Sequence, residues 1–259
     1  MVSSPSKPPI YKFIMPTKRK SPIRKAIVTG GAKGFGVGIA QSLIDAGYTV
    51  WITGRDSRAL DRTAKKIGAI PFQADVASPK DWDKLIAEVK RAPGKFEVLV
   101  NNAGAGVKIA PAAKQSDAEI DTSIAINLTG AIYGCRRAAP LIVKAGGGTI
   151  VNISSACAHH AWPGWSTYSA AKAGLEQFSK CLYLEHREQG LRVTSIAPSW
   201  GATSFSEAAD LGKQDKEIRK RSIKPRELGK VVADVCALPS HLFMQEVILW
   251  PSVQPVEAL

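Results

Sequence analysis

The sequence predicts an α/β protein with one doubly wound parallel sheet of about seven strands and helices on both faces. Three observations support this prediction: short apolar runs rich in β-branched residues, longer amphipathic segments, and a regular alternation of the two. Such apolar runs are typical of strands that are buried on both faces of a parallel sheet. Strand and helix alternating at this spacing indicate right-handed βαβ units.

The apolar runs are the predicted strands, and the amphipathic segments between them are long enough to be helices. The strands are expected over residues 25–29, 48–53, 69–73, 96–101, 149–154, 191–197 and 246–249. The helices are expected over residues 36–46, 57–67, 79–91, 117–144, 168–189 and 226–238. No internal repeat and no linker divides the pattern, so we predict one domain over residues 24–259.

Composition excludes several classes of protein. With 45% hydrophobic and 22% charged residues, the 259-residue chain is neither collagen-like nor wholly disordered. No apolar stretch has the length of a membrane span, so we expect no membrane partner. The four cysteines are scattered without metal-ligand spacing, which favours reduced thiols over disulfides or zinc. We therefore expect a cytoplasmic protein without a metal.

The net charge of +13 is concentrated near the N-terminus. Seven of the 35 Lys and Arg residues lie in residues 1–25, a Pro- and Ser-rich segment that contains no acid. Such a segment cannot bury enough apolar surface to fold, so we predict a disordered basic tail over residues 1–23. Residues 16–20 could be a nuclear address or a weak polyanion contact. A solvated extension, or a start at Met15, is the favoured interpretation, and we do not expect a nucleic-acid partner.

A glycine-rich turn joins the first predicted strand to the first predicted helix. Residues 29–36 read T-G-G-A-K-G-F-G. Glycines at this place permit a tight turn and let the backbone approach a diphosphate, which then rests on the helix N-terminus. The turn therefore predicts a dinucleotide-binding, Rossmann-type domain.

The end of the second predicted strand indicates which dinucleotide is bound. NAD sites normally carry an acid there, bonded to the adenosine ribose. Here residues 51–55 read W-I-T-G-R, so that Arg55 follows the strand, while Lys33 lies in the glycine turn. Two cations suit a 2′-phosphate, so we predict that NADP(H) is preferred over NAD(H). The alternative is that both are ordinary surface cations.

Tyr168 and Lys172 lie four residues apart, and therefore on one face of a helix. A nearby ammonium favours the phenolate and should lower the tyrosine pKa from its usual value of about 10. Tyr168 would then be a usable general acid/base. Upstream, Ser154 and Ser155 end a predicted strand. Open α/β proteins place their chemistry at the carboxyl ends of such parallel strands. A serine there either holds a substrate oxygen or caps the following loop.

From about residue 24 to residue 237, these features resemble the short-chain dehydrogenases/reductases. The glycine turn resembles the family's T-G-x-x-x-G-x-G, and residues 101–104 read N-N-A-G, as the family does after its fourth strand. Asp75-Val76 resembles the dipeptide that contacts adenine. Four residues fall at the positions of the catalytic tetrad: Asn127, Ser155, Tyr168 and Lys172. Several motifs in the right order are far more specific than any one of them.

The resemblance implies an oxidoreductase in which hydride passes between nicotinamide and a carbonyl or alcohol carbon. It implies that Tyr168 transfers the proton, Ser155 polarises the carbonyl, and Lys172 binds the nicotinamide ribose and favours the tyrosinate. Asn127 would hold a water that links Lys172 to solvent. The implied cofactor-binding residues are Gly30, Lys33, Gly34, Phe35, Gly36, Arg55, Asp75, Val76, Asn102, Ala103, Gly104, Tyr168, Lys172, Pro198, Gly201 and Thr203.

The sequence departs from the family pattern at two places. Ser199 follows Pro198 where glycine is usual, and residues 245–254 replace the usual V-D-G-G segment. We interpret the second departure as a variant that affects C-terminal subunit contacts more than chemistry. Because the family is commonly dimeric or tetrameric, often through the helices that hold Asn127 and Tyr168, we expect a homodimer or homotetramer.

The substrate is predicted only as a class of small molecule. Trp162, Trp165 and Trp200 fall on loops that would flank the nicotinamide beside Ser155, and an aromatic mouth suits a hydrophobic carbonyl or alcohol. Packing of the loops is an equal alternative for the tryptophans. His159 and His160 are expected to be exposed loop residues, and contact with the substrate is the alternative.

Three functions remain open. An NADP-dependent carbonyl reductase is favoured. A 3-oxoacyl-[acyl-carrier-protein] reductase would need a basic patch beside the mouth of the site to bind its acidic partner. A non-catalytic NADPH-sensing or binding module is disfavoured by the intact tetrad, because a sensor does not need all four residues.

Overall fold

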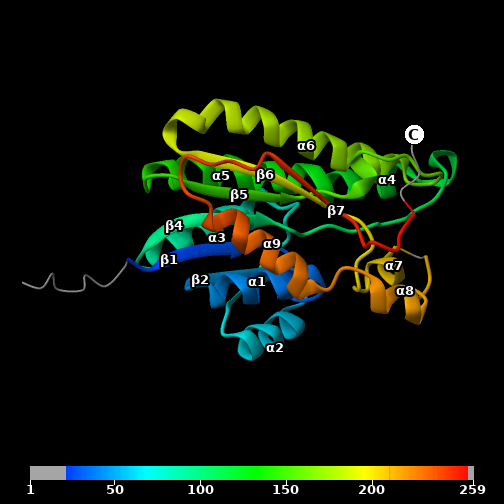
Figure 1. Cartoon of the computed structure of the whole chain (residues 1–259), viewed down its shortest axis with the longest axis horizontal. Coiled ribbons are helices and arrows are strands. Elements are labelled where there is room, and N and C mark those ends of the chain that lie inside the picture. The colour runs from blue at the N-terminus through cyan, green and yellow to red at the C-terminus, as the bar shows by residue number, and fades with distance from the viewer. Residues whose placement is uncertain (1–21, 210, 256–259) are drawn as a thin grey trace, which may run out of the picture.

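The computed structural model describes residues 22–209 and 211–255, which form a seven-stranded parallel sheet (Figure 1). The strand order is β3-β2-β1-β4-β5-β6-β7, so the order reverses between β1 and β4. The strands are β1 (Arg24–Val28), β2 (Tyr48–Gly54), β3 (Ile70–Gln73), β4 (Lys95–Asn101), β5 (Gly148–Ile153), β6 (Leu191–Pro198) and β7 (Glu246–Leu249). The predicted fold class is confirmed, and the predicted strand ends are correct to within one residue.

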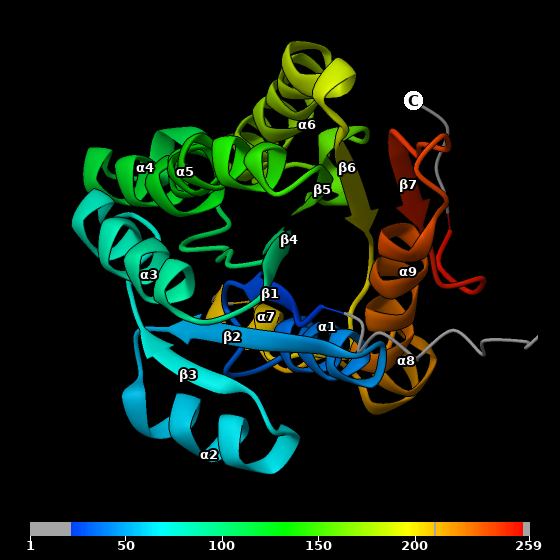
Figure 2. The ribbon, with the colours of Figure 1, turned by 90° about the vertical axis from the view of Figure 1, so that its left-hand side faces the viewer.

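Helices cover both faces of the sheet (Figure 2). The α-helices are α1 (Phe35–Asp45), α2 (Ser57–Ile67), α3 (Pro79–Arg91), α4 (Asp117–Ile124), α5 (Gly130–Lys144), α6 (Ser166–His186), α7 (Phe205–Ala208), α8 (Lys216–Arg221) and α9 (Pro225–Ala237). Short 3₁₀ turns are η1 (Ala112–Lys114), η3 (Ala156–Ala158) and η4 (Arg187–Gln189), and η2 (Ala125–Thr129) is a π-helical segment. The single helix predicted over residues 117–144 is therefore wrong: η2 separates α4 from α5. Helices α7 and α8 were not predicted.

Local sequence explains where several helices begin. The Asp56 side chain caps α2, and the Ser78 side chain caps α3, whose first residue is Pro79. A side-chain oxygen at this position accepts a backbone N–H that has no partner within the helix, and proline at the first position lacks that N–H. Ser116 and Glu119 form a reciprocal capping box at the start of α4. These signals are local in the sequence, which is why the helix starts could be predicted.

Two apolar layers bury the faces of the sheet. One packs α1, α2 and α9 against the sheet, and the other packs α3, α5 and α6 against the opposite face. Helices α1 and α9 touch backbone to backbone: a Cβ atom on Gly38 would lie 2.0 Å from the Pro225 carbonyl oxygen, and one on Gly229 would lie 2.2 Å from the Gly38 carbonyl oxygen. Glycine is therefore required at both positions.

The basic tail predicted over residues 1–23 lies outside the described residues, apart from Pro22 and Ile23. The Ile23 carbonyl accepts a hydrogen bond from the Lys95 N–H at 2.7 Å, so this residue extends the pairing of the central strands β1 and β4. None of the helices in the described part of the chain is long and apolar enough to cross a membrane. All four cysteines are free thiols, and only Cys181 is exposed.

Candidate active site

A cavity of about 1200 Å³ opens at the carboxyl ends of the strands, above the point where the strand order reverses. The turns after β1, β2, β4, β5 and β6 line it, together with residues of α7 and α8. Ligands of open α/β sheets bind at this kind of switch point. The cavity is larger than the usual pocket for one drug-sized ligand, so it has room for a dinucleotide and a second molecule.

The glycine turn and the N-N-A-G segment are joined beneath this cavity. The Thr29 hydroxyl accepts hydrogen bonds from the N–H groups of Asn102 and Ala103, both at 3.0 Å, and Asn102 Nδ2 donates to the Thr29 carbonyl at 2.8 Å. A Cβ atom on Gly36 would lie 2.2 Å from the Gly30 carbonyl oxygen, so this turn closes only around glycine. Gly30, Gly34 and Phe35 line the cavity, whereas Gly36 lies behind them.

Two cations lie at the end of the cavity beside β2. Lys33 and Arg55 line it, are exposed, and form no ion pair with any residue in the ranges 22–209 and 211–255. Asp56 also lines the cavity, but its carboxylate already accepts the Ala59 N–H at 3.0 Å as the cap of α2. The Thr53 hydroxyl is buried at this place and has no hydrogen-bond partner in the described chain. These residues therefore fit a polar, anionic ligand.

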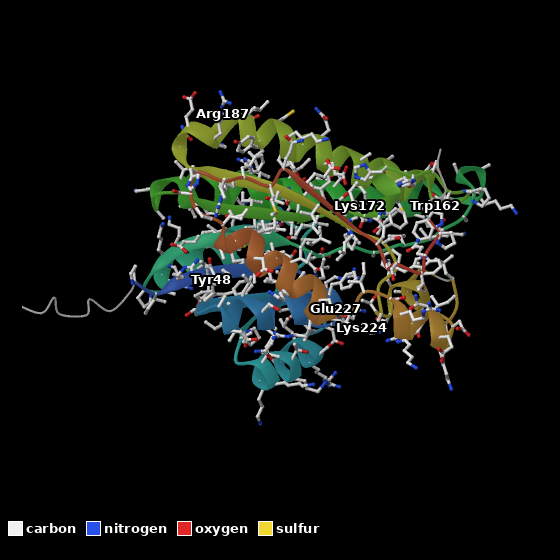
Figure 3. All side chains as sticks on the ribbon, viewed as in Figure 1. Tyr48, Trp162, Lys172, Arg187, Lys224 and Glu227 are labelled. Carbon is white, nitrogen blue, oxygen red and sulfur yellow. The ribbon has the colours of Figure 1, made fainter. Side chains whose placement is uncertain are left out.

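The predicted tetrad residues come together from η2, β5 and α6. Tyr168, Ser155 and Lys172 line the cavity, and Lys172 Nζ lies 5.7 Å from the centre of the Tyr168 ring. Lys172 Nζ also donates to the Ile153 carbonyl at 2.9 Å. Lys172 and Trp162 lie nearer the end of the molecule with α7 and α8, whereas Tyr48 lies toward the other end (Figure 3).

Asn127 does not line the cavity but is fixed behind it. Its Nδ2 donates to the Ala105 carbonyl at 2.8 Å, and its Oδ1 accepts the Ala105 N–H at 3.1 Å. A Cβ atom on Gly104 would lie 3.0 Å from Asn127 Oδ1 and 3.4 Å from Lys172 Nζ. The two side chains therefore border the same small space, which glycine leaves open. π-Helical segments such as η2 are frequent at functional sites, and here one carries Asn127.

Burial dominates the ionisation of the Tyr168–Lys172 pair. Burial raises the pKa of Tyr168 above its ordinary value, and the Ser155 hydroxyl only partly opposes this. Burial also lowers the pKa of Lys172 to about 8. The expectation that Lys172 lowers the pKa of Tyr168 is therefore wrong for the protein alone. The loss of hydration around the phenolate outweighs an ammonium that is not in contact with the hydroxyl.

Aromatic rings form the wall of the cavity next to Tyr168. Trp165 lies edge-on to Tyr168 with 5.7 Å between ring centres, and Phe205 of α7 lies 5.6 Å from Tyr168. Trp162 and Trp200 line the same cavity, as the sequence predicted. The described lining residues include three cations: Lys172 lies beside Tyr168, whereas Lys33 and Arg55 lie at the end of the cavity beside β2.

The loop that follows Ser155 is tied to two other elements. His159 Nε2 lies 3.0 Å from Glu176 Oε2 on α6 and 3.3 Å from Glu246 Oε1 on β7. Glu176 is buried one helical turn after Lys172, and burial raises its pKa. The expectation that His159 is simply an exposed loop residue is therefore wrong. It links the loop that carries Ser155 to the helix that carries Lys172.

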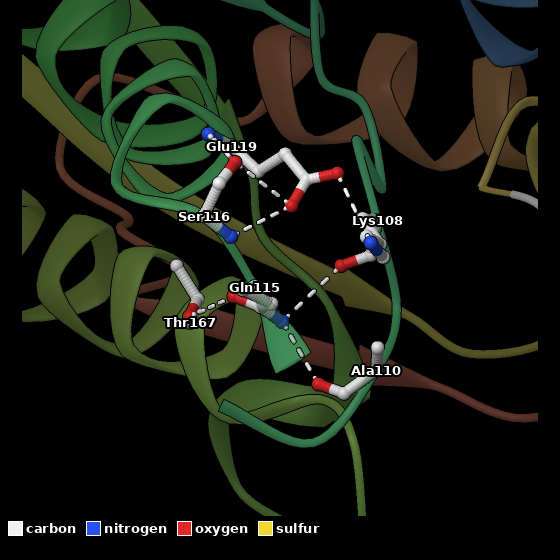
Figure 4. A network of polar contacts seen from close by, with 6 residues as sticks. All are labelled: Lys108, Ala110, Gln115, Ser116, Glu119 and Thr167. Carbon is white, nitrogen blue, oxygen red and sulfur yellow. Dashed lines mark hydrogen bonds and ion pairs between the residues drawn. The ribbon is translucent and has the colours of Figure 1, made fainter. Parts of the chain in front are cut away.

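A polar network holds the opposite loop, between β4 and α4 (Figure 4). Gln115 Nε2 donates to the carbonyls of Lys108 and Ala110, at 3.3 and 2.9 Å. Gln115 Oε1 accepts the hydroxyl of Thr167, the residue before Tyr168, at 2.6 Å. Lys108 also pairs with Glu119 at 3.3 Å. The network positions this loop against the start of α6.

The remaining predicted cofactor residues all line the cavity: Asp75, Val76, Asn102, Ala103, Gly104, Pro198, Gly201 and Thr203. Ser199 lines it as well, and Val107 is the one non-glycine residue in the described chain with a positive φ. Ser199 therefore occupies a conformation that does not require the usual glycine. Serine in place of the usual glycine therefore does not strain the backbone of the turn after β6.

Sequence reasoning missed two groups of lining residues. Phe205, Leu211 and Ile218 come from the region of α7 and α8, and Gln254 and Pro255 come from the segment after β7. The first group lies in short helices that lack an extended apolar period. The second group lies in and directly after the variant segment of residues 245–254, which we expected to affect subunit contacts more than chemistry.

A parallel sheet with a glycine turn, a buried Tyr–Lys pair and a two-part cavity defines a dinucleotide-dependent oxidoreductase. Residues 24–214 match the family model described as short chain dehydrogenase. The chain is 31% identical over 240 residues to the NADP-dependent 3-hydroxy acid dehydrogenase YdfG of Salmonella typhi, covering 90% of this chain and 97% of that protein. The protein belongs to the short-chain dehydrogenase/reductase family and is an NAD(P)-dependent enzyme of that family.

Two solved structures extend the likeness to three dimensions. The closed form of serine dehydrogenase complexed with NADP⁺ has a TM-score of 0.83 and 29% identity, covering 91% of this chain and 98% of that chain. The 3-ketoacyl-(acyl-carrier-protein) reductase of Brucella melitensis, complexed with NADH, has a TM-score of 0.81 and 27% identity, covering 87% of this chain and 96% of that chain.

Proposed function

We propose that this protein is an NADP(H)-preferring oxidoreductase that interconverts an apolar ketone or aldehyde and its alcohol, with Tyr168 as general acid/base. One observation carries the proposal: Tyr168, Ser155 and Lys172 meet the aromatic wall inside the cavity whose other end holds Lys33 and Arg55. A cavity with one cationic end and one apolar end suits a phosphorylated dinucleotide beside an apolar substrate.

Charge supports NADP(H) over NAD(H). Lys33 and Arg55 would bind the 2′-phosphate, while the Asp56 carboxylate, which could otherwise bind a ribose hydroxyl, is engaged in capping α2. YdfG is named as NADP-dependent and the serine dehydrogenase is complexed with NADP⁺, although the Brucella reductase is complexed with NADH. The cofactor would lie along Gly30, Gly34, Phe35, Asp75, Val76, Asn102, Ala103, Gly104, Pro198, Gly201 and Thr203.

The chain's own residues would handle the proton. Bound nicotinamide supplies the hydride chemistry. During reduction the Tyr168 hydroxyl donates its proton to the substrate oxygen, and the Ser155 hydroxyl donates a hydrogen bond to the same oxygen. Lys172 would stabilise the phenolate that remains, which matters because burial disfavours that anion. Asn127 would hold a water beside Gly104, within the space that it shares with Lys172.

The proposal is tested by Tyr168→Phe. We expect turnover of an aliphatic ketone with NADPH to fall by about 100-fold or more, because the general acid is lost. NADPH binding, followed by cofactor fluorescence, should stay within about two-fold of the wild type, since the ring remains. A variant that keeps a tenth or more of the activity would rule out the proton-transfer role. Clear NADPH binding without turnover of any carbonyl would favour the non-catalytic module.

A second candidate is the reductase of a 3-oxoacyl chain on acyl carrier protein. Exposed cations flank the mouth on and around α8, whose Ile218 lines the cavity. They are Lys213, Lys216, Arg219, Lys220 and Arg221. Complementary charge steers an acidic carrier, and salt weakens such steering. The candidate requires kcat/KM for the carrier-bound chain to fall with salt and with Lys216→Glu, while a free thioester of the same chain is unaffected.

We also propose that the protein is a homodimer or homotetramer in the cytoplasm. The edge strand β7 and the residues before it expose Leu242, Met244 and Ile248, an apolar surface that a second copy would cover. Free thiols support a reducing compartment.

A further inference from the structure

The segment after β7 closes one side of the cavity. Residues 250–255, which we call the C-terminal strap, lie on the side of the molecule that carries α7 and α8 (Figure 1). Just before the strap, the Leu249 carbonyl accepts the Ser199 N–H at 2.9 Å. Within it, the Trp250 ring lies edge-on to His160 with 5.1 Å between ring centres. The strap is thus attached to two loops that form the candidate active site.

Gln254 extends from this strap to the wall of the cavity. It lines the cavity and is only 8% exposed. Its Oε1 accepts the Trp200 backbone N–H at 3.3 Å, and only the oxygen end of an amide can accept from that donor. This contact determines the orientation of the amide, and the Nε2 donor takes no part in it.

Nε2 of Gln254 has no hydrogen-bond partner within residues 22–209 and 211–255. Nε2 is not one of the fully buried polar atoms that lack a partner in the described chain, so a molecule in the cavity can reach it. A bound molecule that offers an oxygen there would accept its hydrogen bond. Trp200, whose backbone orients the amide, itself lines the cavity with the other aromatic residues. Gln254 therefore lies beside Trp200, a residue that the sequence assigns to the substrate side of the nicotinamide.

We propose that Gln254 is a specificity-determining residue whose Nε2 donates a hydrogen bond to a second acceptor oxygen of the substrate, apart from the reacting carbonyl. The proposal rests on the carbonyl chemistry proposed above and narrows the substrate class. The second acceptor is uncharged, such as an ester, thioester or amide oxygen. A carboxylate would favour a cation at this place. The cations among the described lining residues are Lys33, Arg55 and Lys172, and the proposed function assigns all three to the cofactor and to Tyr168, so none is left to pair with a substrate carboxylate.

Two substitutions separate the donor from the strap contact. Gln254→Glu keeps an oxygen for the Trp200 N–H but has no amide donor, and Gln254→Met keeps length while losing both contacts. The test substrates are ethyl 3-oxobutanoate, which carries the second acceptor, and 2-heptanone, which has the same chain length without it. Each variant is compared with the wild type for each ketone, so intrinsic reactivity cancels.

For both variants we expect kcat/KM with ethyl 3-oxobutanoate to fall by about 10-fold, the effect of one hydrogen bond. The value for 2-heptanone should change by less than about three-fold. Val253→Ala is the matched control, because Val253 is a neighbouring strap residue that does not line the cavity. It should leave the ratio of the two kcat/KM values unchanged. Equal losses for both ketones in Gln254→Glu would show a merely structural role and overturn the proposal.

Binding keeps this proposal separate from the proposed reaction. In the Tyr168→Phe background with NADPH present, dissociation constants of both ketones are measured by quenching of tryptophan fluorescence. We expect Gln254→Glu to weaken binding of ethyl 3-oxobutanoate by about 10-fold and to leave 2-heptanone unchanged. If the wild type reduces neither ketone, the reaction proposed above fails, yet this contrast still decides the role of Gln254. No contrast in binding would overturn it.

Discussion

The pKa values of Lys172 and Tyr168 depend more on how deeply the two side chains are buried than on their spacing in the sequence. Its spacing from Tyr168 predicted that the two share a helix face, and the structure places both on the cavity. The spacing could not predict that both would be almost fully buried, at 7% exposure for Tyr168 and 3% for Lys172. Desolvation then acts against both charged forms, which reverses the expected direction for the tyrosine.

The depressed pKa of Lys172 makes stability depend on pH in a defined window. The pKa of Lys172 is 10.5 in the unfolded chain and about 8 in the folded protein. Between these pH values the unfolded chain therefore binds one more proton than the folded protein. The free energy of unfolding therefore rises with pH across this window. Lys172→Met lacks this titration. We expect the unfolding free energy of the wild type minus that of the variant to rise by about 3 kcal/mol from pH 8 to 10.5.

Urea unfolding of both proteins without cofactor, at several pH values, measures this difference. Buried groups whose ionisation does not depend on Lys172 are present in both proteins and cancel, whereas the loss of the Lys172 charge also acts on the neighbouring Cys157 thiol. The lost hydrogen bond to the Ile153 carbonyl shifts the variant by the same amount at every pH. A difference that stays constant with pH would contradict the assignment of a depressed pKa to Lys172.

At the scale of elements, helix limits were predictable where the residues that set them are adjacent in the sequence. Helices α2 and α3 carry their caps in the adjacent sequence, and both were predicted at their observed limits. The π-helical segment η2 was not predicted. The sequence from α4 to α5 has a continuous helical pattern, and only the backbone hydrogen bonding changes at η2. Gly130, the residue after η2, lies close to the backbone of Val76, which is distant in the sequence: a Cβ atom on Gly130 would lie 2.9 Å from the Val76 carbonyl oxygen.

The contact between α1 and α9 gives a prediction at this scale. Gly229→Ala would place its methyl group 2.2 Å from the Gly38 carbonyl oxygen, so the two helices must separate. Overpacking of this kind costs about 1–3 kcal/mol, and we expect a corresponding fall in unfolding free energy. Gly174→Ala on α6 is the matched control. Its methyl would meet only the flexible Leu128 side chain, at 3.3 Å, and helix propensity favours alanine. Equal effects of the two changes would contradict the packing argument.

At the scale of the whole molecule, the cavity unites segments from almost every part of the chain. Its described lining extends from Gly30 to Pro255. Sequence motifs located the cofactor half, since the glycine turn and N-N-A-G are short, contiguous signals. The substrate half depends on how α7, α8 and the strap fold over the strand ends. That arrangement has no contiguous signal, so Phe205 and Gln254 emerged only from the structure.

Cofactor binding should stabilise the whole molecule in proportion to its affinity. At a concentration 100-fold above the dissociation constant, we expect NADPH to raise the melting temperature by roughly 5–10 °C. NADH at the same concentration should raise it less, because it leaves Lys33 and Arg55 without a phosphate. Arg55→Asp should reduce the NADPH shift and increase the NADH shift. Thermal unfolding measures all four shifts, and an unchanged order in the variant would contradict the role of Arg55.

The position of the strap makes the two ends of the chain unequal as handles for purification or immobilisation. Gln254 and Pro255 are part of the cavity wall, so a tag or resin joined directly after Pro255 would start at that wall. The first strand instead begins at the amino edge of the sheet, on the far side from α7 and α8 (Figure 1). A tag joined directly before β1 would start on that far side, so assays of this enzyme are best made with a tag at this place.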